Sequence, residues 1–294
     1  QFESDAASCF DRIAMRFAIL GFITTGAPLA AATMWLKTLA HVVHSVKTGF
    51  GLSKGSYSSS TEHPIVGPGQ GSKGGPAACS MITSPLLKVM DKLATGISFT
   101  DPLQGLHYAT KALMFIDDNT NYSNRFLTWL HKPPTAATLR DTLEHDAQIW
   151  ERLLWTSGGL LKLPKCLYYL MHWTFDDEGK ATLTDKEFLP DMHLTSGDSI
   201  RPEKINQHNS DEAHRTLGCW LATNFQMHTA ISTLTKKAST FGRKLLCSSL
   251  DQYESWIAYS VVFVPMMTYT FGITHHSLSS TSPLSRVNQP VPLS

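Results

Sequence analysis

The sequence predicts an α+β fold, and three observations carry this prediction. The short apolar run from Ala112 to Ile116 is typical of a strand and ends at an Asp-Asp pair. Residues 138–155 place apolar side chains at helical spacing. Helical and extended segments do not alternate regularly along the chain, which favours α+β over a parallel α/β sheet. The 294 residues, 42% of them hydrophobic, suffice for one large core or two modest domains.

The composition argues against a strongly basic protein, a disulfide-stabilised protein and a membrane-spanning protein. The formal net charge is +1, so any nucleic-acid-binding surface must be a local basic patch. The cysteines show no metal-ligand spacing and are expected to be reduced thiols in a reducing compartment. They are Cys9, Cys79, Cys166, Cys219 and Cys247. Residues 17–36 and 256–273 lack charges, but Pro28 and Pro265 interrupt them, so buried helices are expected and no membrane span.

The N-terminal third begins with a strand that runs into a helix over residues 1–11. Asp11 is a candidate N-cap for a helix over residues 12–22. Gly26-Ala27-Pro28 ends this helix, and Pro28 suits the first turn of a second one that reaches about residue 46. The Gly-, Ser- and Lys-rich residues 48–76 predict a hairpin or loop before the next helix.

The following elements are predicted from apolar pattern and turn residues. A helix covers residues 77–93, and the strand 112–116 turns tightly into a second strand, which places Asp117 and Asp118 at a hairpin tip. Ser157-Gly158-Gly159 stops the helix 138–155. The remaining predictions are strand material over 160–173, loops around short strands over 176–212, helices over 217–271 and an extended tail over 274–294.

Three short motifs follow one another in a fixed order. They are Glu3-Ser4-Asp5-Ala6-Ala7-Ser8-Cys9-Phe10-Asp11, Gly67-Pro68-Gly69-Gln70-Gly71 and Phe115-Ile116-Asp117-Asp118. Singly, each is commonly a cap, a loop or a solvated turn. Together they resemble motifs A, B and C of the reverse transcriptase family, particularly of non-long-terminal-repeat retrotransposons. Residues 157–166 resemble motif D and residues 214–220 resemble motif E.

The resemblance implies a fold and a domain order. It predicts a polymerase palm over 1–215, with an antiparallel sheet backed by helices, and a primer grip and helical thumb over 216–273. The residues 274–294 are then a tail or linker. The family's fingers precede motif A, so the chain is expected to be a fragment with the fingers largely missing and with little or no polymerase activity alone.

The resemblance also implies two-metal phosphoryl transfer. A primer 3′-hydroxyl attacks the α-phosphate of a nucleotide, and two Mg²⁺ ions (or Mn²⁺) stabilise the charge on the attacking and leaving oxygens. Mg²⁺ prefers carboxylate oxygens. The resemblance assigns Asp5 and Asp117 to both metals and Asp118 to one of them. Strand pairing must then bring the three carboxylates together.

Other residues take nucleotide-binding roles by resemblance. Phe10 matches the steric gate that excludes ribonucleotides, with a core aromatic as the alternative. Gln70 and Gly71 match the motif B pair that contacts the incoming nucleotide and the template. The sequence departs from the family where Gly75 precedes Pro76, because many relatives carry serine there.

The motifs further along the chain supply positioning groups. Lys165 matches the motif D lysine, a proposed general acid for pyrophosphate, with Lys162 as a competitor and a solvated lysine as the alternative. Leu217 and Gly218 match the primer grip, or are a simple turn. Four basic residues of the predicted thumb could contact the phosphates of a duplex, or form a solvated helix face. They are Lys236, Lys237, Arg243 and Lys244.

The resulting prediction is an RNA-directed DNA polymerase of a retroelement. Its partners would be an RNA template, a DNA primer and deoxynucleoside triphosphates, in an intracellular location, nuclear or cytoplasmic. Two alternatives stay open. One is another palm polymerase, such as a group II intron maturase, a telomerase-like enzyme or a viral RNA polymerase. The other is a non-catalytic nucleic-acid-binding remnant of a retroelement.

Overall fold

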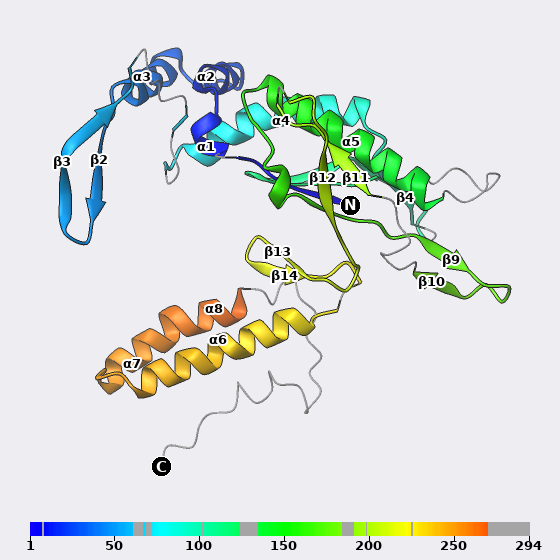
Figure 1. Cartoon of the computed structure of the whole chain (residues 1–294). Helices are drawn as coiled ribbons and strands as arrows, with labels where there is room; N and C mark the ends of the chain where they lie inside the picture. The colour runs from blue at the N-terminus through cyan, green and yellow to red at the C-terminus, as the bar shows by residue number, and fades with distance from the viewer. Residues whose placement is uncertain are drawn as a thin grey trace. The chain divides into compact units, whose positions relative to one another are not determined.

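The computed structural model describes residues 1–7, 9–60, 67–68, 72–101, 103–123, 135–183, 191–197, 199–224 and 226–269. The chain divides into two compact units, Gln1–His208 and Asn209–Ser294. The first unit combines a largely antiparallel sheet with helices, so the predicted α+β class is confirmed (Figure 1).

A six-stranded sheet organises the first unit. Its order is β11-β12-β8-β1-β7-β6, and β1 (Phe2–Asp5) lies between β7 (Asp118–Asn121) and β8 (Leu167–Tyr169). All neighbours are antiparallel except β12 and β8, which are parallel. The remaining strands are β6 (Ala112–Phe115), β11 (Met192–Leu194) and β12 (Glu203–His208).

Two long helices pack against one face of this sheet. They are α4 (Gly75–Leu93) and α5 (Ala136–Thr156), which contact each other (Figure 1). Phe2 of β1 and Trp150 of α5 are both almost fully buried in the shared core. The predicted helices 77–93 and 138–155 match α4 and α5, and α5 ends at Ser157-Gly158 as expected, with Gly158 at φ +90°.

The buried face of α5 also carries two carboxylates. Asp146 is fully buried and accepts hydrogen bonds from the backbone N–H groups of Thr95 (2.9 Å) and Gly96 (3.1 Å) and from the Ser123 hydroxyl. Glu151 is 1% exposed and accepts a hydrogen bond from the backbone N–H of Gly197 (2.6 Å). These bonds tie loops of the first unit to α5.

The segment after β1 differs from its prediction. The helix expected over residues 12–22 is two helices, α1 (Cys9–Arg12) and α2 (Met15–Thr24), so Asp11 lies inside α1 and is not an N-cap. Ala14 occupies the N-cap of α2 and makes no side-chain cap.

The second predicted helix ends earlier than expected. It is α3 (Leu29–Ala40), and the chain then forms the hairpin of β2 (Val43–Thr48) and β3 (Gly51–Ser58). The β-branched pair Val42-Val43 favours extended backbone once a partner strand is present. The sequence predicted either a hairpin or a loop over residues 48–76.

The strand in the region 160–173, β8, is shorter than predicted. A 3₁₀ turn, η1 (Leu163–Lys165), interrupts the predicted strand, because Pro164 has no N–H to donate to a strand ladder. Further two-stranded hairpins complete this unit. They are β4 (Ile97–Thr100) with β5 (His107–Thr110), and β9 (Trp173–Phe175) with β10 (Ala181–Leu183).

The second unit begins with a hairpin where helix was predicted from residue 217. Strands β13 (His214–Thr216) and β14 (Cys219–Leu221) pair across the two-residue turn Leu217-Gly218. The helices that follow are α6 (His228–Leu246), α7 (Gln252–Ala258), the π-helical turn η3 (Tyr259–Phe263) and α8 (Val264–Thr268). The predicted border at 215/216 falls inside β13, and the predicted tail 274–294 lies outside the described residues.

Among the described residues, none of the helices combines the length and apolarity needed to cross a bilayer.

Candidate active site

The predicted carboxylates meet where β1 and β7 pair. Asp5 lies directly opposite Asp118 in the antiparallel register, and Asp117 precedes Asp118 in the turn between β6 and β7. Residues directly opposite each other in antiparallel strands place their side chains on the same face of the sheet. The chain therefore brings together backbone positions that are more than a hundred residues apart in sequence.

The side chains of Asp5 and Asp118 lie on the face away from α4 and α5. Burial alternates along β1, where Phe2 and Ser4 are buried and Asp5 is half-buried. It alternates in the same way along β7, where Asn119 is buried and Asp118 is exposed. The two carboxylates are thus accessible to a ligand, while the opposite face of their strands is buried in the core.

The turn that carries Asp117 has an unusual backbone conformation. Ile116 has φ +60°, which a β-branched residue adopts only at a cost of about 1–3 kcal/mol. The Cys79 thiol of α4 donates a hydrogen bond to the Ile116 carbonyl (3.1 Å), and the Ile116 side chain packs against the cluster around Ile13 and Cys79. These contacts hold the turn in a conformation that it would not adopt alone.

Lys165 supplies a cation to the site. Its Nζ lies 2.8 Å from Oδ2 of Asp5. The hydrogen bond to Asp5, with the negative charge of that carboxylate, raises the pKa of Lys165 above 10.5. Because like charges directly opposite each other destabilise a strand pair, a cation at Asp5 relieves its repulsion with Asp118.

The position of Lys165 follows from the turn η1. The backbone N–H of Lys162 donates to the Asp5 carbonyl (2.9 Å), and Leu163 and Cys166 are buried. Their anchoring leaves the exposed Lys165 at the end of η1, within reach of β1. The side chain of Lys162 is exposed, and Lys162 contacts Asp5 through its backbone N–H.

Replacing Lys165 with Met should lower stability slightly at neutral pH. The folded pKa of Lys165 exceeds its unfolded value of 10.5, so the contribution of the ion pair is fully present below pH 10.5. It is lost as the pH rises through the folded pKa. Unfolding midpoints of the two proteins measured from pH 7 to 11 should therefore begin to approach each other above pH 10.5. A Lys162→Met control should show no such convergence.

The donor set fits a hard divalent cation. Asp5, Asp117 and Asp118 offer only carboxylate oxygens, which Mg²⁺ prefers over nitrogen and sulfur. In the part of the chain that the structure describes, no three His, Cys, Asp or Glu side chains are gathered as metal ligands. With Lys165 on Asp5, metal binding would require this ion pair to open.

Phe10 packs against glycines of the segment that resembles motif B. A Cβ atom at Gly75 would lie 2.9 Å from Cδ1 of the Phe10 ring, and one at Gly67 would lie 1.8 Å from the Phe10 carbonyl oxygen. This close packing favours glycine at position 75. Gln70 and Gly71 lie outside the described residues.

The predicted primer grip is a tight turn within the second unit. Leu217 and Gly218 have φ +50° and +83°, a pair of positive values typical of a type I′ hairpin turn. The Tyr269 hydroxyl donates a hydrogen bond to the Leu217 carbonyl (2.9 Å). The turn is therefore held from within its own unit.

The predicted thumb contacts lie on α6. The helix buries Ala230, Leu234 and Ala238 at a spacing of four residues. All four predicted basic residues are exposed and occur as two pairs seven residues apart, which places them on one helix face. They are Lys236, Lys237, Arg243 and Lys244.

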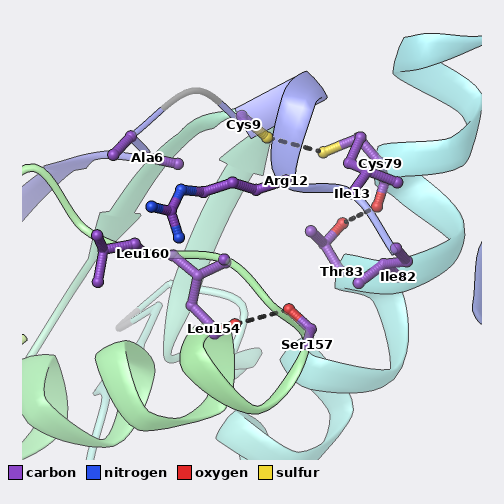
Figure 2. A pocket seen from close by; sticks show the side chains of 12 residues that line it. Ala6, Cys9, Arg12, Ile13, Cys79, Ile82, Thr83, Leu154, Ser157 and Leu160 are labelled. Carbon is purple, nitrogen blue, oxygen red and sulfur yellow. Dashed lines mark hydrogen bonds between the residues drawn. The ribbon is translucent and has the colours of Figure 1, made fainter. Parts of the chain in front are cut away.

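A thiol pair that the sequence pattern does not predict lies beside the site. Cys9 Sγ and Cys79 Sγ are 3.7 Å apart, although 70 positions separate the two residues. Figure 2 shows both side chains at the edge of a pocket, into which Arg12 extends. No sequence spacing indicates this pair, because it depends on how α1 packs against α4.

Comparison with known proteins adds no family assignment. No protein-family model and no curated protein matches the chain.

Proposed function

We propose that the chain forms the palm and thumb of an RNA-directed DNA polymerase of the reverse transcriptase class, from a retrotransposon. The observation that carries this proposal is the register of β1 and β7, in which Asp5 lies opposite Asp118 and beside the turn that bears Asp117. The order of the three motifs along the sequence supports the same assignment.

Each residue of the site has a role in this proposal. Asp5, Asp117 and Asp118 would hold two Mg²⁺ ions, which would stabilise charge on the attacking and leaving oxygens. Phe10 would contact the nucleotide sugar from its position against Gly75. Lys165 would hold a proton for the leaving pyrophosphate once it is released from Asp5.

The second unit would contact the nucleic acid in this proposal. The exposed basic residues of α6 would bind phosphates of an RNA–DNA duplex, and the Leu217-Gly218 turn would position the primer end. Because the net charge of the chain is only +1, this local basic patch would contribute more to phosphate binding than the electrostatic field of the whole chain.

The proposal predicts salt-dependent binding of an RNA–DNA duplex with a recessed primer end. The double substitution Lys237→Glu with Lys244→Glu should weaken binding by about three- to ten-fold at moderate salt and should flatten the salt dependence. Fluorescence anisotropy of a labelled duplex measures both effects. Lys88→Glu, on the exposed surface of α4, is the matched control. Equal losses for both variants would contradict a specific role of α6.

A non-catalytic retroelement remnant is the second candidate. The pairing of Asp5 with Lys165, and the lack of a gathered metal-ligand group among the described residues, favour it. Metal titration separates the two candidates. A binding remnant would bind the duplex with no Mg²⁺ or Mn²⁺ response that depends on Asp117.

A further inference from the structure

The thiols of Cys9 and Cys79 are close enough to react with each other. Cys9 lies in α1, three residues after the bridge that Ala6 forms with Leu161, and Cys79 lies in the second turn of α4. Their sulfur atoms are 3.7 Å apart, so an approach of about 1.6 Å would reach the length of a disulfide bond. Figure 2 shows the two side chains directed toward one another.

A small oxidant has a route to this pair. Both cysteines line a pocket of about 20 Å³, roughly the space of one water molecule. Cys9 is half-buried and Cys79 is 2% exposed, so the pair is reached from the Cys9 side. Hydrogen peroxide is only slightly larger than water, whereas a bulky oxidant would be excluded.

We propose that Cys9 and Cys79 are a peroxide-sensitive dithiol that closes to an intramolecular disulfide. The Cys79 thiolate attacks one peroxide oxygen, which breaks the O–O bond, forms a sulfenic acid and releases water after proton transfer. The Cys9 sulfur then attacks the Cys79 sulfur, which forms the S–S bond and releases a second water. Two thiols are oxidised, and one peroxide is reduced to two waters.

The surroundings favour Cys79 as the first thiol to react. The hydrogen bond from Cys9 lowers the pKa of Cys79 below 9.0. The same hydrogen bond, burial and the charges of Cys79, Asp117 and Asp5 raise the pKa of Cys9. Cys9 is therefore the resolving thiol. By contrast, burial raises the pKa of Cys166 to about 11, so that thiol is expected to be inert.

The disulfide would change the turn at Ile116. As a thiol, Cys79 donates to the Ile116 carbonyl, and a disulfide sulfur has no proton to donate. The strained turn that carries Asp117 would then lose one of the contacts that hold it. Formation of the disulfide is independent of the polymerase proposal, so each can fail without the other.

Mass spectrometry of the peroxide-treated full chain tests the proposal. After treatment with hydrogen peroxide, the number of cysteines that can be alkylated in denaturant should fall from five to three. A peptide map should contain Cys9 linked to Cys79, and dithiothreitol should restore all five thiols. Hydrogen exchange of the peptide that spans residues 112–121 should be faster in the oxidised chain, because the Ile116 turn is released.

Two variants control the experiment. Cys9→Ser removes the resolving thiol, so it should abolish the linked peptide and leave Cys79 as a sulfenic acid that dimedone captures. Cys247→Ser, at an exposed cysteine of the second unit, should leave the cross-link intact. Oxidation of Cys9 or Cys79 to sulfinic acid without a linked peptide would overturn the proposal, as would linkage through Cys247 instead. If Cys9→Ser does not fold, Cys9→Ala provides the same comparison.

Discussion

Asp117→Asn should weaken binding of Mn²⁺ to the chain on the order of 100-fold. The substitution keeps the shape of the side chain but removes a negative charge and one strong oxygen donor. Asp117 lies in the turn next to Asp118, which is opposite Asp5, so the loss falls on one of the three proposed metal ligands. Electron paramagnetic resonance of free Mn²⁺ measures the affinity without any need for catalysis.

Two further variants make this measurement specific. Asp91→Asn changes an exposed carboxylate on α4 and should leave Mn²⁺ affinity unchanged. Lys165→Met removes the cation that competes for Asp5 and should tighten Mn²⁺ binding. If the parent chain binds no Mn²⁺, or if Asp117→Asn binds it equally well, the two-metal proposal is wrong.

Asp146→Ala should lower the free energy of unfolding by about 3–5 kcal/mol. The Asp146 side chain is fully buried and accepts hydrogen bonds from the N–H groups of Thr95 and Gly96 and from the Ser123 hydroxyl. Removing the carboxylate leaves the buried Gly96 N–H and the partly buried donors of Thr95 and Ser123 without their acceptor. The loop that follows α4 would separate from α5.

Urea unfolding followed by circular dichroism measures this loss. The matched control is Asp141→Ala, at an exposed position of the same helix, where the change should stay within about 0.5 kcal/mol. Asp146→Asn keeps an acceptor oxygen and should lie between the two. A loss for Asp146→Ala no larger than that for Asp141→Ala would show that these bonds contribute little.

The parts of the fold set by local pattern could be predicted from the sequence. The apolar spacing gave α4 and α5, and Gly158 marked the end of α5, because helix periodicity and positive φ are local properties. The proximity of Asp5 to Asp118 also matches the strand pairing expected from the motifs. Their chemical roles remain predictions.

The parts that depend on tertiary packing could not be predicted. Asp146 and Glu151 have polar side chains, so a hydrophobic pattern assigns them to the surface. Both are nevertheless buried, and both accept hydrogen bonds from backbone N–H groups of distant loops. Val43 begins a strand and not a helix turn, because a partner strand exists. The Cys9–Cys79 pair depends on the packing of α1 against α4, which no spacing encodes.

The central place of β1 in the sheet sets the order in which the molecule can assemble. Phe2 pairs with Asn121 on one side and with Tyr168 on the other, so both neighbours of β1 come from far along the chain. Such distant pairings require large loops to close first and are slow to form. Asp5 should therefore come close to Asp117 and Asp118 only in the last kinetic phase of refolding, well after α4 and α5 have become helical.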